Sequence, residues 1–238
     1  MTVQYGQNRA TMPVRPREVK ESPYRMVKVM TTPPPRACAR DQRRETILAV
    51  AREVFFEQGY TAASMSTIAA RLGGSKGTLY NYFKSKEELF EAQVRSMCGA
   101  AADRILEVAA EGEPVETLTR LGEQYLQHLF SQSTVQMFRI LVAEAQRSPE
   151  LARVFYEVGP ARGQKGLESY LEAAKARGLI DLPDCALAAE QFLSLCKGRT
   201  HLQFLLNLIA PLSSDAIRLQ TAQAVNAFMT LYGAKPRG

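Results

Sequence analysis

The chain has 238 residues, of which 46% are hydrophobic, and a formal net charge of +6 at pH 7. This size is sufficient for one large domain, or for a small domain joined to a larger one. Because no apolar run reaches 18 residues and the basic N-terminus lacks an apolar segment, we expect no membrane span, no secretory signal, no membrane partner and a cytoplasmic location.

The positive charge is concentrated at the N-terminal end. Residues 1–44 contain 10 Lys and Arg against 3 Asp and Glu, whereas the remaining residues contain 20 against 21. Six of the twelve prolines lie in residues 1–37, so we expect this segment to be a disordered, basic, proline-rich arm. A polyanionic partner and a simply solvated tail both fit the charge. Met26 and Met30 leave open the hypothesis of a later start.

Residues 38–87 show the pattern of a small helical domain. A first helix begins at about Asp41 and ends at Gly59, because apolar residues recur at helical spacing between them. Ser64 is a suitable N-cap for a second helix, which continues to about Leu72. After a Gly-Gly turn, Ser75 begins a third short helix, over about Lys76–Phe83, whose core positions are Leu79 and Phe83.

The rest of the chain, residues 88–238, continues as helices. Ser85 and Glu88 form a capping box before a helix over about 86–110. Gly159-Pro160 should kink or split its helix, and Asp184 should begin a long apolar helix that ends near Leu208. The other segments predicted to be helical are 114–131, 133–147, 150–177 and 213–232. Because no alternating strand pattern occurs, we predict an all-α fold.

The second and third helices have the layout of a helix-turn-helix motif, in which the second of the two enters the DNA major groove. Lys76 can contact a phosphate or a guanine edge, Gly77 permits close approach to DNA, and Thr78 offers both a hydroxyl and a methyl group. Tyr80 and Tyr82 can donate to phosphates, and Asn81 is polar on the same side. Ser64 and Lys86 lie at helix N-termini, which favour phosphate.

The resemblance to a known family rests on residues 43–89, RRETILAVAREVFFEQGYTAASMSTIAARLGGSKGTLYNYFKSKEEL. This segment resembles the DNA-binding domain of the TetR family of bacterial transcriptional regulators. Gly74 stands where many members have valine, and Thr67 where an acidic residue is frequent. The resemblance implies contacts with double-stranded DNA at Ser64, Ser66, Lys76, Gly77, Thr78, Tyr80, Tyr82 and Lys86.

The C-terminal part resembles the AefR-like branch of the same family, over VAEAQRSPELARVFYEVGPARG at residues 142–163 and the segment after it. The resemblance implies a homodimer that pairs through its last two helices and binds a palindromic operator. It also implies release from the operator by a small hydrophobic or amphipathic effector in a larger helical ligand-binding and dimerisation domain. Differential affinity of DNA and effector for two conformations is sufficient for such release.

The central helices contain candidate effector contacts, although ordinary core packing is the more frequent role of such residues. Two histidines without a carboxylate at ligand spacing make a poor metal site, and a surface or ion-paired role is the alternative for the arginine. The candidates are His128, Met137, Phe138, Leu141, Phe155, Arg162, Phe192, His201 and Phe204.

Two further observations narrow the class of protein, and one alternative to a repressor is left open. The chain contains no GxSxG, P-loop, GxGxxG or HExxH motif, so we predict that it is not an enzyme. The four cysteines, Cys38, Cys98, Cys185 and Cys196, form no metal-ligand spacing, so we expect no metal or cofactor, and a redox role for one of them stays open. An activator, or an interaction module that does not bind DNA, remains an alternative to a repressor.

Overall fold

The computed structural model describes residues 36–107 and 112–234, and within these ranges it contains helices and no strand. The all-α prediction is confirmed. One isolated bridge joins Ile180 to Gly233, next to a hydrogen bond from the Asp181 N–H to the Tyr232 carbonyl oxygen, 2.9 Å long. This contact ties the turn that contains Ile180 and Asp181 to the end of the last helix.

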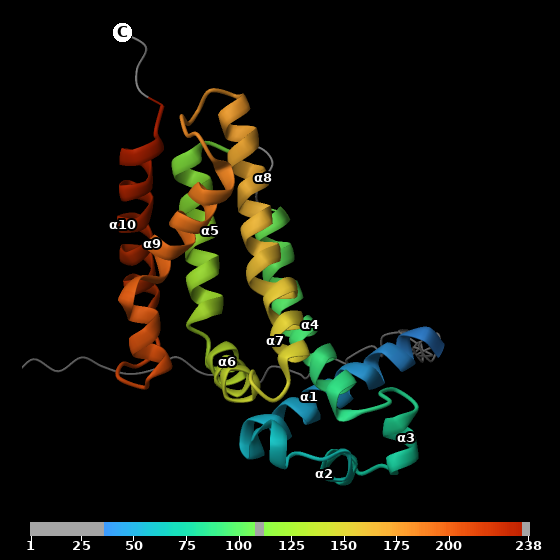
Figure 1. Cartoon of the computed structure of the whole chain (residues 1–238). Coiled ribbons are helices and arrows are strands. Elements are labelled where there is room, and N and C mark those ends of the chain that lie inside the picture. Colours follow the sequence, from blue (N-terminus) through green and yellow to red (C-terminus); the bar gives the residue numbers. More distant parts are fainter. Residues whose placement is uncertain (1–35, 108–111, 235–238) are drawn as a thin grey trace, which may run out of the picture.

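The helices form two groups (Figure 1). The first group contains three helices and the start of a longer fourth helix, and the second is a bundle that the fourth helix enters. The helices are α1 (Arg36–Ala62), α2 (Met65–Arg71), α3 (Lys76–Tyr80), α4 (Lys86–Glu107), α5 (Pro114–Leu129), α6 (Gln132–Glu144), α7 (Pro149–Tyr156), the π-helix η1 (Glu157–Ala161), α8 (Arg162–Ala176), α9 (Cys185–Leu205) and α10 (Ser214–Tyr232).

Each group has its own hydrophobic core. In the first, side chains of α1, α2, α3 and α4 surround Phe55, which is fully buried, and α6 and α7 add Met137, Leu141 and Leu151. The second core lies between α5, α8, α9 and α10. Because α4 contacts α1 near its beginning and α7, η1 and α8 further along, it is a rigid connection between the two groups.

The beginning and end of several helices differ from the predictions. Helix α1 begins at Arg36, so Arg36 and Ala37 are helical, and the rest of the predicted arm lies outside the described residues. Gly59, the predicted end of the first helix, interrupts α1 with a φ of 75° and a ψ of 168°. Glycine adopts such a positive φ without steric cost. Helix α3 ends at Tyr80 rather than Phe83, because Asn81 forms its C-cap.

Two helical segments of the second group are irregular. Near the predicted kink at Gly159-Pro160, the backbone forms the π-turn η1 between α7 and α8. The break in α9 at Gly198, with a φ of 50°, was not predicted. Two carbonyl oxygens at this break, those of Cys196 and Lys197, accept hydrogen bonds from the side-chain amide of Gln220 on α10.

Close packing between α5 and α10 generates a stability prediction. A Cβ atom at Gly122 would lie 2.7 Å from Cγ2 of Thr221, whereas a Cβ at Gly99 meets nothing within 4 Å. We expect Gly122→Ala to lower the free energy of unfolding by about 1–2 kcal/mol, because overpacking exceeds the gain in helix propensity. The control, Gly99→Ala, should stabilise the protein by up to about 1 kcal/mol. Urea unfolding at one protein concentration measures the free energy of unfolding of both variants. A Gly122→Ala variant as stable as the native protein, or more stable, would contradict the prediction.

Candidate nucleic-acid interface and internal cavity

Serine side chains begin α2, α3 and α4, as predicted. The Ser64 hydroxyl oxygen accepts from the Thr67 N–H at 3.1 Å, and that of Ser75 accepts from the Thr78 N–H at 3.2 Å. Ser85 accepts from the Glu88 N–H at 3.2 Å. The Glu88 carboxylate accepts in return from the Lys84 N–H, one residue before the position of a regular capping box. These caps fix where each short helix starts and hence the orientation of α3.

Helix α3 is anchored by two side chains. Leu79 and Phe83 are each 1% exposed and belong to the first core, which confirms them as core positions. The guanidinium of Arg44 lies over the Phe83 ring, 5.2 Å from its centre. Anchored in this way, α3 presents its opposite side to solvent.

The predicted DNA-contacting residues on this side differ in exposure. Lys76, Gly77, Tyr80 and Asn81 are exposed, with Tyr80 49% exposed. Ser66 on α2 is also exposed, whereas Ser64, Thr78 and Tyr82 are half-buried, and Tyr82 packs against the first core. A Cβ added at Gly77 would meet only the Ser75 hydroxyl oxygen at 3.6 Å, which is an ordinary contact. The fold therefore does not require glycine there.

Lys86 lies at the junction between α1 and α4. Its ammonium donates to the Tyr60 carbonyl oxygen at 2.9 Å and lies 4.3 Å from the centre of the Tyr60 ring. The Tyr60 hydroxyl donates in turn to Oε1 of Glu87 at 3.1 Å. Burial and the neighbouring carboxylate raise the pKa of Tyr60. Lys86 thus has a structural partner that its sequence position did not indicate; an ammonium has three donors, so a phosphate contact remains compatible with this geometry.

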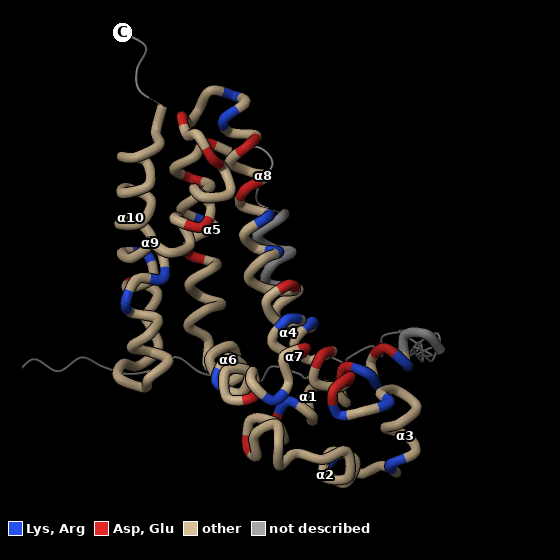
Figure 2. The backbone as a smooth tube through the Cα atoms, in the orientation of Figure 1, with Lys and Arg blue, Asp and Glu red and all other residues tan. Residues whose placement is uncertain are grey.

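The charge around α2 and α3 is one-sided. Between Glu57 and Glu87 the chain has no acidic residue, while Arg71, Lys76, Lys84 and Lys86 are basic. Figure 2 shows basic segments next to the α2–α3 turn and after α3. The Glu57 carboxylate of α1 pairs with Arg71 of α2 at 2.7 Å. The exposed lysine, tyrosine and hydroxyl groups of α3 and of the turns beside it are suited to a phosphate backbone.

The second group contains a cavity of about 580 Å³, between α4, α5, α6, α7, η1, α8 and α9. Both irregular segments reach it, since Gly159 and Pro160 of η1 and Lys197 before the break in α9 line its wall. Its size is that of a pocket for a small organic molecule. The lining residues are Cys98, Tyr125, His128, Leu129, Thr134, Val135, Phe138, Phe155, Tyr156, Gly159, Pro160, Gly163, Gln164, Glu190, Leu193, Ser194, Lys197, His201 and Leu205.

Four of the nine predicted effector residues line this cavity: His128, Phe138, Phe155 and His201. The other five do not belong to its lining. Met137 and Leu141 are buried in the first core, Phe192 and Phe204 are buried in the second, and Arg162 is exposed on α8. Lys197 and Gln164, which the sequence did not single out, do line it. The helical spacing of apolar residues could not identify Lys197 and Gln164 as lining residues, because irregular backbone forms part of the cavity wall.

One wall of the cavity is aromatic and the other is polar. The ring centres of Phe138 and Phe155 are 5.8 Å apart, and the His201 ring lies 6.1 Å from that of Phe138. Glu190, Ser194, Lys197 and His201 follow one another along α9. Burial lowers the pKa of His201, and the Lys197 charge lowers it further, so the imidazole is neutral at pH 7.

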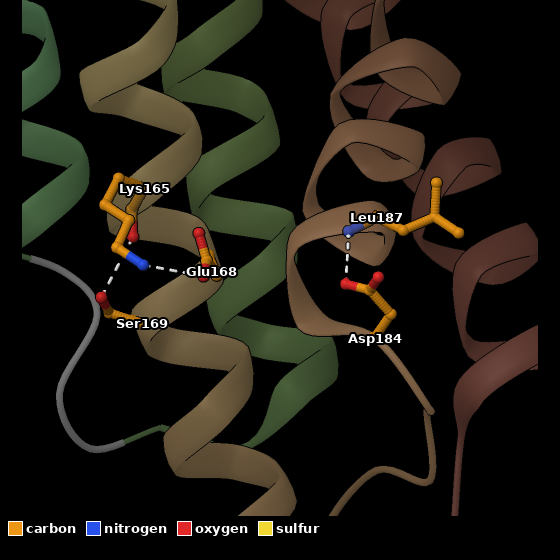
Figure 3. Close-up of polar contacts among 5 residues, drawn as sticks. All are labelled: Lys165, Glu168, Ser169, Asp184 and Leu187. Atoms are coloured by element: carbon orange, nitrogen blue, oxygen red, sulfur yellow. Dashed lines mark hydrogen bonds and ion pairs between the residues drawn. The ribbon is translucent and has the colours of Figure 1, made fainter.

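A second, more open hollow lies between α8 and the start of α9. Two of its three acidic side chains already have partners: Glu168 accepts from the Lys165 ammonium at 2.7 Å, and Asp184 caps α9 by accepting from the Leu187 N–H at 3.0 Å (Figure 3). The hollow is open to solvent. We therefore assign no ligand to it.

Three observations on the described residues bear on a metal site, a membrane span and a reactive thiol. In residues 36–107 and 112–234, no three His, Cys, Asp or Glu side chains lie close enough together to hold a metal ion. Within the same ranges, the helices fall short of the length and apolar character that crossing a bilayer requires. Burial raises the pKa of the Cys98 thiol to about 11 and that of Cys196 to about 12, which makes both thiols unreactive.

Two separate parts of the chain match family models. Residues 47–93 match the model described as bacterial regulatory proteins, tetR family. Residues 116–234 match the model described as AefR-like transcriptional repressor, C-terminal domain. The second match covers the residues that form most of the cavity, and the first covers the helix-turn-helix.

Individual proteins show the same likeness. The transcriptional regulator BetI of Rhizobium meliloti is 30% identical over 193 residues, covering 80% of this chain and 91% of BetI. The solved structure of the flavonoid-responsive regulator FrrA is 34% identical, with a TM-score of 0.69, and the match covers 83% of this chain and 100% of that one. The transcriptional activator FasR of Mycolicibacterium smegmatis is 53% identical over 53 residues, covering 22% of this chain and 24% of FasR.

The contact between α1 and α6 generates a prediction. The Thr61 hydroxyl donates to Oε1 of Glu144 at 2.6 Å, and Glu144 is only 9% exposed. Thr61→Val removes the donor and leaves the carboxylate less well satisfied, so we expect the free energy of unfolding to fall by about 1–3 kcal/mol. Thr61→Ser keeps the hydroxyl and should retain most of the stability. Urea unfolding followed by circular dichroism compares them; identical midpoints would show that the contact contributes nothing.

Proposed function

The chain belongs to the TetR family of bacterial transcriptional regulators, and we propose that it is a homodimeric repressor that a small-molecule effector releases from a palindromic operator. The observation that carries the proposal is the connection by α4 between an exposed helix-turn-helix, whose residues 58–86 include no Asp or Glu, and an internal cavity. The likeness of the C-terminal half to AefR-like repressors favours repression. FasR, an activator, shares the helix-turn-helix segment, so activation is the rival to be tested.

In this proposal α3 lies in the major groove. Lys76, Gly77 and Thr78 face the base edges, and the bare backbone at Gly77 allows the helix to approach closely. Tyr80 and Asn81 contact the adjoining backbone from the exposed side. Phosphate contacts by the remaining predicted residues position the helix: Ser64, Ser66, Tyr82 and Lys86.

The proposed dimer uses α9 and α10. Seven of the eleven exposed large hydrophobic residues lie between Leu187 and Leu231, on these two helices and the loop between them. Most of α10 is also free of charged residues, which Figure 2 shows as an almost uniformly tan tube. Exposed apolar side chains concentrated on one helix pair favour burial against a second copy.

The effector site in this proposal is the cavity, which contacts the DNA-binding group through two connections. Cys98 on α4 lines it, and α4 begins at the Tyr60 junction. Phe138 on α6 also lines it, and α6 ends at Glu144, the partner of Thr61. A ligand that fits only one arrangement of these helices shifts the protein toward that arrangement. Because DNA is its target, we place its action in the cytoplasm.

The DNA-binding assignment is tested with Lys76→Ala. On an operator selected by the native protein from randomised duplexes, we expect affinity to fall about tenfold or more, with relaxed preference at the contacted position, because a good base contact is worth about 1–3 kcal/mol. Fluorescence anisotropy over a range of salt concentrations measures both. Lys165→Ala removes the same charge from α8 and should leave operator binding unchanged. Native affinity in Lys76→Ala would refute the placement of α3.

The dimer assignment is tested with Leu202→Glu. Leu202 is 59% exposed on α9, so the variant should fold, but a carboxylate buried in the proposed interface should shift the protein to monomers. Val142, 60% exposed on α6, supplies the control Val142→Glu, which should remain dimeric. Light scattering after size-exclusion chromatography gives the mass of each. A dimeric Leu202→Glu variant would place the interface elsewhere.

A further inference from the structure

We propose that the effector is a planar aromatic anion, whose rings lie against Phe138 and Phe155 and whose acidic group pairs with Lys197. This inference rests on the proposed function, because it identifies the chemical class that the same cavity would bind. The cavity of about 580 Å³ is in the range of sites that enclose a small organic molecule. Its two walls differ in chemistry, and together they specify a ring and a charge.

The aromatic wall favours rings over alkyl chains. Phe155, Phe138 and His201 form a series of neighbouring rings, with centres 5.8 and 6.1 Å apart. Phe130 lies behind His201, with the two ring centres 5.9 Å apart, which supports the position of the imidazole. Flat aromatic ligands can make offset or edge-to-face contacts with such a surface. These contacts add to the binding free energy beyond what the burial of apolar area contributes.

Lys197 determines the sign of the charge. It is the one Lys or Arg among the lining residues, it is half-buried, and none of the ion pairs found between described residues includes it. An anionic ligand group would supply the counterion that the half-buried Lys197 lacks among the described residues. The neutral His201, one turn further along α9, supplies a hydrogen bond to the same group without adding charge.

The break in α9 supports this role. Lys197 is the last residue before Gly198, and its carbonyl oxygen and that of Cys196 are held by the Gln220 amide of α10. Its backbone is therefore fixed by a second helix. Lys197 therefore lines the cavity from a backbone position that a neighbouring helix holds in place, which is the arrangement that a ligand contact needs.

Glu190 defines the rival ligand class. Among the described residues it is the one carboxylate in the lining, it is exposed, and it precedes Lys197 by seven residues, which separates them by about 10 Å along a helix. A ligand with an organic cation would use Glu190 and the aromatic rings instead. Because Lys197 is more buried than Glu190, the observations favour the anion.

Isothermal titration calorimetry on the full chain, with four probes, tests the proposal. The probes are naphthalene-2-carboxylate, its neutral amide, decanoate and a naphthylmethyl trimethylammonium ion. We expect the carboxylate to bind at least tenfold more tightly than each of the other three. Equal affinity for the carboxylate and the amide, preference for decanoate or for the cation, or no binding by any probe would each overturn the proposal.

Variants of Lys197 locate the charge. Lys197→Met should reduce affinity for the carboxylate about tenfold or more, to that of the amide, and leave binding of the amide unchanged. Lys197→Arg should retain the preference for the carboxylate, and Lys165→Met on α8 should behave as the native protein. Melting temperatures confirm that each variant is folded. A carboxylate preference that persists in Lys197→Met would refute the assignment of Lys197.

Operator binding by the same samples separates this inference from the proposed function. If the carboxylate binds through Lys197 but does not release the operator, the ligand class stands and effector release fails. If the protein binds its operator and no probe enters the cavity, the regulator stands and the ligand class is wrong.

Discussion

The position of the DNA-binding group relative to the bundle depends on the environment of Tyr60. Its ring is buried, stacks on Phe55 with ring centres 5.9 Å apart, and meets the edge of Phe90 at 4.9 Å. Its carbonyl oxygen and ring face hold the Lys86 ammonium, and its hydroxyl holds Glu87. One residue thus joins the end of α1 to the first turn of α4 by apolar packing, a cation–π contact and two hydrogen bonds, one from its hydroxyl and one to its backbone carbonyl oxygen. A cation–π contact at such a part-buried site contributes about 1–2 kcal/mol.

A second connection runs through α6, and it contacts the cavity directly. Phe138 lines the cavity, while the next residue, Arg139, donates to the carbonyl oxygens of Phe204 and Leu205 at the end of α9. Further along α6, Glu144 accepts from Thr61. A displacement of the aromatic wall is therefore passed to α9 through Arg139 and to α1 through Glu144. Only the helix α6 lies between these two contacts. Packed helices pass on small displacements when their packing has two stable arrangements.

The sequence predicted the features that depend on neighbouring residues. The caps at Ser64, Ser75 and Ser85, and the anchoring of α3 by Leu79 and Phe83, follow from local hydrogen bonding and helical spacing. The resemblance to TetR regulators supplied the family, which composition and periodicity did not.

What depends on tertiary structure could not be predicted. The carbonyl and ring of Tyr60 are distant from Lys86 in the sequence, so the partner of that lysine was invisible. Gly198 lies between Lys197 and Arg199 in a segment that was predicted to be one continuous helix. Its break is tolerated because Gln220 of another helix satisfies the freed carbonyls. The separation of cavity-lining Phe138 from core-buried Met137, its neighbour, likewise depends on where α6 packs.

The hydrogen bonds of Gln220 have a consequence for the dose–response of a dimer. They tie the backbone of Lys197, in the cavity wall, to α10, a helix of the proposed subunit interface. In the proposed dimer, a ligand that displaces Lys197 would also displace a helix of the subunit interface, and the second cavity would no longer bind independently of the first. The resulting coupling free energy would make the operator respond over a narrower or a broader range of effector concentration than one isolated site allows.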